Sequence, residues 1–90
     1  MLVRVITFGL LTEILEKDVL VDLVEGSDLN TLILLLERKS GSLKGFLGEF
    51  SIKYDVAILI NGRSIHLLKE MKTRLKEGDI IHFLLPYSGG

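Results

Sequence analysis

The residues best suited to chemistry lie at the end of the chain, in the stretch LLPYSGG (Leu84–Gly90). Glycine has no Cβ, so a Gly89-Gly90 end is the slimmest peptide that a protein can insert into a narrow site. Gly90 also carries an α-carboxylate, which ATP can activate as an acyl adenylate. Pro86 has no N–H to donate and is expected to end the preceding strand. The stretch predicts a reactive tail over residues 86–90, with an incidental glycine end as the alternative.

The rest of the chain offers few groups for catalysis. It has no cysteine, which excludes a disulfide framework and a thiolate nucleophile. Its nine glycines form no phosphate-binding motif. His66 and His82 fall in strand-like segments among apolar neighbours, where a partly exposed sheet histidine is more common than a metal ligand or a base. No metal site is predicted, and the expected function is binding or carrying.

Composition indicates where the protein is located and which kinds of partner it is not expected to bind. The net charge of −1 argues against broad electrostatic capture of nucleic acid. The apolar runs LILLL and VAILI are far too short to span a bilayer. The first residues lack the cleavage site of a signal peptide. We expect a cytoplasmic protein that binds neither nucleic acid nor a membrane.

The hydrophobic pattern predicts a single domain over residues 1–90, with five strands and one main helix. Strands are predicted at residues 2–8, 19–24, 54–60, 64–68 and 80–85, and a helix over 28–41. Asp28 is the expected N-cap of the helix, and Asn61-Gly62 the expected tight turn between the third and fourth strands. One amphipathic helix can cover one face of one mixed sheet, which gives a two-layer α+β domain. The other face of the sheet is left open.

The alternation of side chains predicts which residues occupy the open face. If Val3, Val5, Ile81 and Phe83 point inward, their neighbours point outward. The expected open-face residues are Arg4, Ile6, Phe8, Ala57, Leu59, Ile80, His82 and Leu84. Each apolar member alone is an ordinary exposed side chain. Together, near the root of the tail, they indicate a surface for docking a partner.

The whole chain resembles a known family. The motifs in order are Asn61-Gly62, the segment TRLKEGD (Thr73–Asp79), the apolar strand Ile80–Leu85, Pro86 and Gly89-Gly90. This series is similar to that of the ubiquitin-like β-grasp sulfur carriers, of which the MoaD-like small subunit of molybdopterin synthase is the nearest type. The resemblance implies a ubiquitin-like β-grasp fold.

The resemblance also implies a function and its residues. A ubiquitin-activating-type enzyme would use ATP to adenylate the Gly90 carboxylate, which then becomes a thiocarboxylate, with Gly89 as the second tail residue. The large synthase subunit (MoaE-like) would take up the tail and pass the sulfur to a pterin precursor. The chain would be the non-catalytic small subunit and would bind no cofactor itself. The implied partner-binding residues are Phe8, Leu59, His82, Leu84, Pro86, Tyr87 and Ser88.

Other functions remain open from the sequence. The same activated glycine can form an isopeptide bond with a lysine, as in a ubiquitin-like modifier. Sulfur carriers also serve cysteine, thiamine and tRNA thiolation pathways. A plain interaction module with an incidental Gly-Gly end is the third hypothesis. The sulfur acceptor, the choice of molybdenum or tungsten, and the oligomeric state are not specified by the residues.

Overall fold

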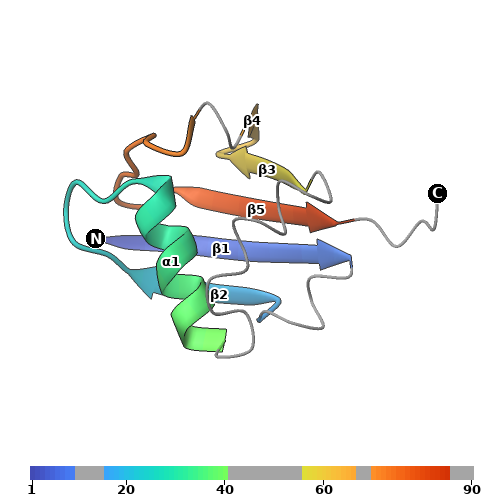
Figure 1. Cartoon of the computed structure of the whole chain (residues 1–90), viewed down its shortest axis with the longest axis horizontal. Coiled ribbons are helices and arrows are strands. Elements are labelled where there is room, and N and C mark those ends of the chain that lie inside the picture. The colour runs from blue at the N-terminus through green and yellow to red at the C-terminus, as the bar shows by residue number, and fades with distance from the viewer. Residues whose placement is uncertain (10–15, 41–55, 67–69, 86–90) are drawn as a thin grey trace.

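The computed structural model describes residues 1–9, 16–40, 56–66 and 70–85, which form five strands and one helix (Figure 1). In chain order the elements are β1 (Leu2–Gly9), β2 (Asp18–Asp22), α1 (Leu29–Ser40), β3 (Ala57–Ile60), β4 (Arg63–Ile65) and β5 (Ile80–Leu85). This is the order that the hydrophobic pattern predicted.

The strands form one mixed sheet in the order β2-β1-β5-β3-β4. β1 and β5 are parallel neighbours, whereas every other neighbouring pair is antiparallel. Because parallel strands end at the same edge, the last residues of β1 lie beside the last residues of β5. The β1–β5 pairing therefore determines which side chains surround the point where the chain leaves the sheet.

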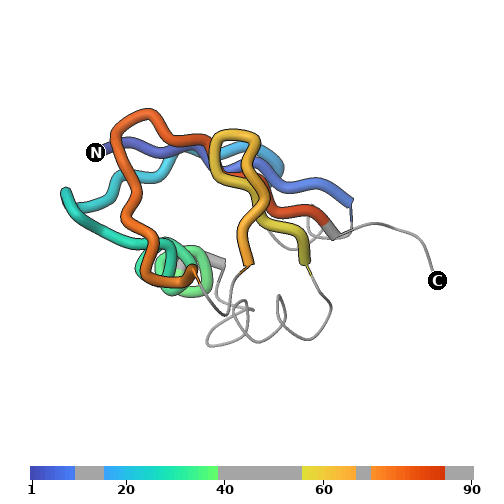
Figure 2. The backbone as a smooth tube through the Cα atoms, turned by 90° about the horizontal axis from the view of Figure 1, so that it is seen from above, coloured from blue at the N-terminus to red at the C-terminus, as the bar shows by residue number. Residues whose placement is uncertain are grey.

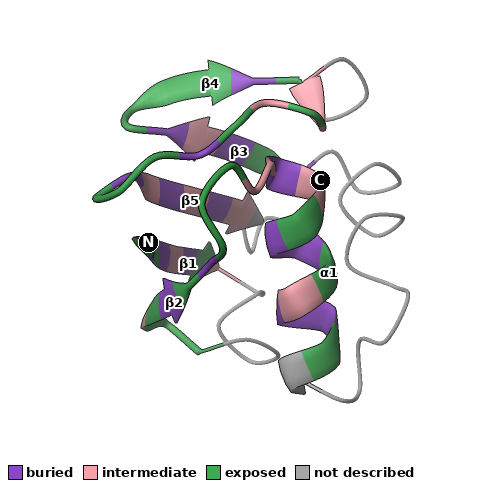
Figure 3. Ribbon diagram, turned by 90° about the vertical axis from the view of Figure 1, so that its left-hand side faces the viewer, coloured by how far each residue is buried: buried purple, intermediate pink, exposed green. Residues whose placement is uncertain are grey.

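Helix α1 packs across one face of the sheet and creates a two-layer arrangement (Figures 1 and 2). Four helix residues with helical spacing point into the core: Leu29, Leu32, Ile33 and Leu36. Five sheet residues opposite them are at most 1% exposed: Val3, Val5, Ile58, Ile81 and Phe83. Figure 3 shows buried residues alternating with more exposed ones along β1 and β5. The α+β class and the predicted inward faces are confirmed.

Asp28 caps the N-terminus of α1, as predicted. Its Oδ1 accepts a hydrogen bond from the Thr31 N–H (2.9 Å) and another from the Thr31 hydroxyl (3.0 Å). The first of these bonds satisfies one of the N–H groups that the first helical turn leaves without a partner. The Thr31 backbone hydrogen bond is the largest cause that lowers the pKa of the Asp28 carboxyl below its ordinary value.

Removing this cap is expected to lower the free energy of unfolding. Asp28→Ala should cost about 1 kcal/mol at neutral pH, whereas Asp28→Asn should cost less because an amide oxygen also caps. The pKa of Asp28 is lower in the folded state than in the unfolded state, so the ionised carboxylate stabilises the fold at pH values above the ordinary pKa of aspartate. This contribution is lost as the pH falls through the lowered pKa of the folded state. Urea unfolding at neutral pH and at about pH 3 measures both effects. An equal cost of Asp28→Ala at both pH values would contradict the assignment.

β2 ends earlier than predicted. The sequence predicts this strand over residues 19–24, but it covers Asp18–Asp22. The chain turns at residues 24–27, where the Ser27 N–H donates to the Val24 carbonyl (3.0 Å) and Gly26 has a positive φ of 86°. The apolar character of Val24 suggested a longer strand, but its side chain is 81% exposed.

β4 is also shorter than the predicted segment 64–68 and covers Arg63–Ile65. His66 does not continue the strand, because it exchanges two hydrogen bonds with Glu70. The His66 N–H donates to the Glu70 carboxylate (2.7 Å), and the Glu70 N–H donates to the His66 carbonyl (2.9 Å). The prediction that His66 lies in a strand is therefore wrong. β3, predicted from residue 54, covers Ala57–Ile60, and residues 54 and 55 lie outside the described ranges.

Candidate docking surface

The sheet face opposite α1 carries an apolar surface at the end where β1 and β5 finish. We define the docking surface by six residues: Ile6, Phe8, Ala57, Leu59, His82 and Leu84. All six are exposed or partly exposed, and Phe8 is 44% exposed. Within the described residues, α1 covers only the other face of the sheet. The predicted open face is confirmed.

The sheet register arranges these six residues in two rows across three strands. Ile6 pairs with His82, and His82 pairs with Leu59, which forms the first row. Phe8, Leu84 and Ala57 form the second row, which lies nearer the end of β5. Directly paired residues on one face are within side-chain contact. The six side chains therefore form one continuous surface beside the root of the C-terminal segment.

One aromatic contact joins the two rows diagonally. The rings of Phe8 and His82 stack, with their centroids 5.8 Å apart and their planes 13° from parallel. The stack crosses from β1 to β5, so it depends on the parallel pairing of two strands that are far apart in the sequence. The alternation pattern predicted that both residues lie on the open face, but it could not predict that their rings stack.

An ion pair lies beside the docking surface, on the side away from the root of the C-terminal segment. The Arg4 guanidinium donates to both Asp18 carboxylate oxygens, from Nε at 2.9 Å and from Nη2 at 2.5 Å. This hydrogen bonding is the largest cause that lowers the pKa of Asp18, and hydrogen bonding to Asp18 likewise raises the pKa of Arg4. Both side chains are solvent-exposed, so the pair contributes little to stability. It gives the apolar surface a charged border.

The start of β5 is fixed by Asn61 and Asp79. The Asn61 amide donates from Nδ2 to the Asp79 carboxylate (2.9 Å), and its Oδ1 accepts from the Ile80 N–H (2.9 Å). The other Asp79 oxygen accepts from the Lys76 N–H (2.7 Å). The predicted Asn61-Gly62 turn is confirmed, with φ values of 52° and 82°. A slip of one residue in β5 would turn its outward residues inward, so these bonds preserve the face on which a partner would dock.

The structure brings four of the predicted site residues together and leaves the others undescribed. Phe8, Leu59, His82 and Leu84 all lie on the docking surface. Pro86, Tyr87, Ser88, Gly89 and Gly90 lie outside the described residues. The sequence analysis did not predict that Asp18 pairs with Arg4. The available signal was the opposite charge of an aspartate on a neighbouring strand, since such cross-strand pairs are favourable.

In the described ranges, no helix is long and apolar enough to cross a membrane. The same ranges contain no group of three or more histidine, cysteine, aspartate or glutamate side chains that could hold a metal ion.

The arrangement of the sheet and the helix defines the class of protein. The chain has a ubiquitin-like β-grasp fold, as a crystal structure of SAMP1 from Haloferax volcanii illustrates. That structure superposes with a TM-score of 0.78 over 100% of both chains at 22% sequence identity. A family model described as the ThiS family matches residues 5–90, and the chain belongs to that family. No curated protein sequence matches the chain.

Two further solved structures have higher sequence identity. One is a chain in the complex of subunits 1 and 2 of the molybdopterin-converting factor from Helicobacter pylori 26695, with 34% identity, 100% coverage of both chains and a TM-score of 0.65. The other is the small archaeal modifier protein 1 from Methanosarcina acetivorans, with 26% identity, coverage of 99% of this chain and 96% of that one, and a TM-score of 0.69. The resemblance to MoaD-like β-grasp proteins is thus confirmed, and the class comprises both sulfur carriers and ubiquitin-like modifiers.

Proposed function

We propose that this chain is the sulfur-carrying small subunit of a molybdopterin synthase. The observation that carries the proposal is the full-length, 34% identical match to a chain from a complex of subunits 1 and 2 of a molybdopterin-converting factor. The docking surface supports it, because an apolar face beside the root of the tail is what a second subunit would need to grip the carrier and receive its end.

The proposed chemistry resides at Gly90. An adenylating enzyme joins the Gly90 carboxylate to AMP from ATP and releases pyrophosphate. A donor of hydrosulfide then attacks the carbonyl carbon, the bond to AMP breaks, and a thiocarboxylate is left on Gly90. In the complex with the large subunit, the thiocarboxylate sulfur attacks a carbon of the pterin precursor and displaces an oxygen leaving group, which forms a thioester between Gly90 and the pterin. Water then hydrolyses the bond between the Gly90 carbonyl carbon and sulfur, so that the sulfur stays on the pterin and Gly90 returns to a carboxylate. The carrier itself needs no bound cofactor, because ATP belongs to the adenylating enzyme. An ATP-dependent step of this kind fits the cytoplasm.

The carrier's own residues have positioning roles in this proposal. Phe8, Leu59, His82 and Leu84 bind the large subunit through the docking surface. Pro86, Tyr87 and Ser88 belong to the tail and would contact the large subunit there, with Gly89 providing the slim approach to the reactive end. The large subunit supplies the catalytic groups. The same surface and tail would serve the adenylating enzyme, because both partners must reach the same carboxylate.

A second function, conjugation to proteins, is favoured by one observation. The small archaeal modifier protein 1 from Methanosarcina acetivorans is 26% identical over nearly the whole chain. In that role the adenylated Gly90 would acylate a lysine of a target protein instead of receiving sulfur. Carrier roles in cysteine, thiamine or tRNA thiolation use the same thiocarboxylate and differ only in the acceptor.

Mass spectrometry of the protein from its own host separates these functions. For the carrier, we expect intact chains in which one oxygen of the Gly90 carboxylate is replaced by sulfur, and co-purification of the large subunit. For the modifier, we expect Gly-Gly remnants on lysines of other proteins. A chain that lacks Gly90 is the negative control and should show neither product. Absence of the thiocarboxylate from cells that are making molybdopterin would contradict the proposal.

A further inference from the structure

His82 lies at the centre of the docking surface and is its only titratable residue. Ile6 flanks it on β1 and Leu59 on β3, in direct register. Leu84 follows it on the same face of β5, and Phe8 stacks on its ring. The ring is partly exposed in the free chain. A partner that covers this surface must therefore cover the imidazole together with its apolar surroundings.

The described elements next to His82 offer no negative charge that could pair with it. On β1 the nearest charged group is Arg4, which is already paired with Asp18 of β2. On β3 the residues of the open face are Ala57 and Leu59, and Ile80 precedes His82 on the same face of β5. Within the described residues, no hydrogen bond involves either ring nitrogen of His82. A positive imidazolium would be tolerated in the free chain, by water and by the face of Phe8.

We propose that docking of the large subunit selects the uncharged form of His82, so that the carrier docks well at neutral pH and loses affinity as the pH falls. This inference rests on the proposed function, since it concerns the surface that the large subunit would cover. Burying an unpaired charge among apolar side chains is costly, whereas a neutral imidazole needs only a hydrogen bond. The partner expected from this argument has an apolar surface that covers His82 and places no carboxylate over it.

The sign and size of the effect follow from proton linkage. Imidazole is the side chain that changes charge between about pH 5 and 8. If only the neutral form docks, a proton must leave before binding, and the affinity falls with falling pH. A partner that excludes the charged form then loses up to about tenfold in affinity for each unit by which the pH falls within this range. Arg4 and Asp18 do not contribute, because the pKa of Arg4 is raised and that of Asp18 is lowered, away from this range.

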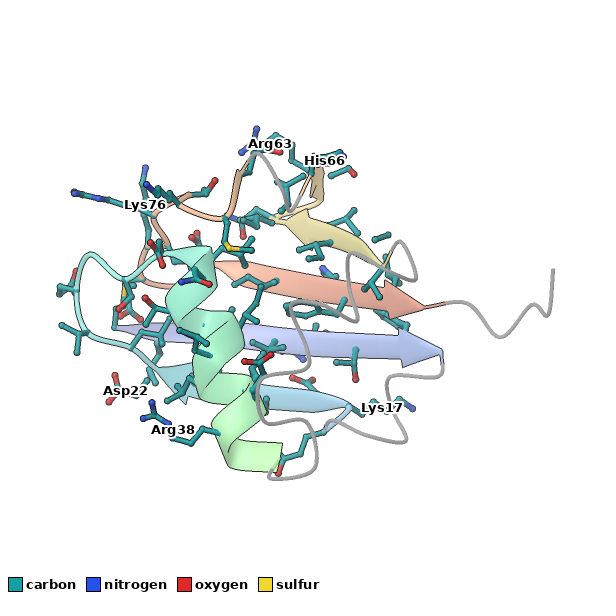
Figure 4. All side chains as sticks on the ribbon, viewed as in Figure 1. Lys17, Asp22, Arg38, Arg63, His66 and Lys76 are labelled. Atoms are coloured by element: carbon teal, nitrogen blue, oxygen red, sulfur yellow. The ribbon has the colours of Figure 1, made fainter. Side chains whose placement is uncertain are left out.

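The experiment measures the Kd of the purified chain for the large subunit encoded in the same genome, at about pH 8 and pH 5.5 and at constant ionic strength. The readout is the ratio of the two Kd values within each variant. Wild type should bind about tenfold more weakly at the lower pH. His82→Gln should bring this ratio close to one. His66→Gln is the control for loss of the other imidazole and should keep the wild-type ratio, because His66 is exposed just beyond β4, at the edge of the sheet, and is not one of the six residues of the docking surface (Figure 4).

A permanent cation gives an independent test at one pH. His82→Lys should bind at about pH 8 at least as weakly as wild type does at pH 5.5, and far-UV circular dichroism checks that each variant is folded. A wild-type ratio of one, or an unchanged ratio in His82→Gln, would overturn the inference and leave the proposed function intact. Tighter binding at low pH would also overturn it, because it would indicate a partner carboxylate over His82. Absence of binding at both pH values would overturn the proposed function and this inference with it.

Discussion

Leu84→Asp is expected to weaken binding of the large subunit at least about 100-fold while the domain stays folded. Leu84 lies on the docking surface, in register with Phe8 of β1 and Ala57 of β3. A carboxylate placed there remains hydrated in the free chain but loses its water when a partner covers it. An unpaired charge buried in this way costs about 3–5 kcal/mol, and each 1.4 kcal/mol is about a factor of ten in Kd.

The chain offers a matched control for this substitution. Leu34 is 51% exposed on α1, which covers the opposite face of the sheet. Leu34→Asp introduces the same charge into the same kind of side chain and should leave binding of the large subunit unchanged. Isothermal titration calorimetry of both variants, with urea unfolding beside it, gives the comparison. If Leu84→Asp unfolds the chain, Leu84 belongs to the core; if both variants bind normally, the partner uses another face.

The faces of the sheet were predictable because they depend on local alternation. Val3, Val5 and Thr7 of β1 and Ile81 and Phe83 of β5 are buried, and the residues between them are exposed or partly exposed. The pattern needs only the period of a strand and the presence of one helix. The N-cap at Asp28 and the turn at Asn61-Gly62 were predictable for the same reason, since each depends on a few neighbouring residues.

Features that join distant parts of the chain could not be predicted in this way. The parallel pairing of β1 with β5 brings Arg4 opposite Ile80 and Phe8 opposite Leu84, and nothing in either segment alone specifies the other. The stack of Phe8 on His82 and the ion pair of Arg4 with Asp18 follow from such pairings. The predicted ends of β2 and β4 were wrong because hydrogen bonds in the turns that follow these strands determine where each strand ends.

The motifs that identify the family are mostly structural in this chain. In the segment Thr73–Asp79, Leu75 is 3% exposed in the core, Gly78 adopts a positive φ of 84°, and the Asp79 carboxylate holds Asn61 and the Lys76 N–H. These residues fix β5 in place. The residues proposed to contact partners are ordinary apolar side chains and one histidine, which carry no recognisable motif. Recognition of the family therefore predicts the framework better than it predicts the specificity.

Phe83→Ala is expected to have the largest effect on stability and to complement Leu84→Asp. Phe83 is adjacent to Leu84 but points to the other face, where it is fully buried against the core. Removing a buried phenylalanine side chain costs about 3–5 kcal/mol, because apolar burial is lost and a cavity is left. This is a large part of the about 5–15 kcal/mol that stabilises a typical domain, so the midpoint of urea unfolding should fall sharply.

Phe8→Ala is the matched control for this prediction. Phe8 is 44% exposed on the docking surface, so the same truncation should cost much less stability and should instead weaken binding of the large subunit. Phe83→Ala molecules that remain folded should bind with nearly the wild-type Kd, because their docking surface is unchanged. The two phenylalanines thus separate the two roles of the sheet, the inner face for stability and the outer face for docking. A greater loss of stability in Phe8→Ala than in Phe83→Ala would reverse the assignment of both faces.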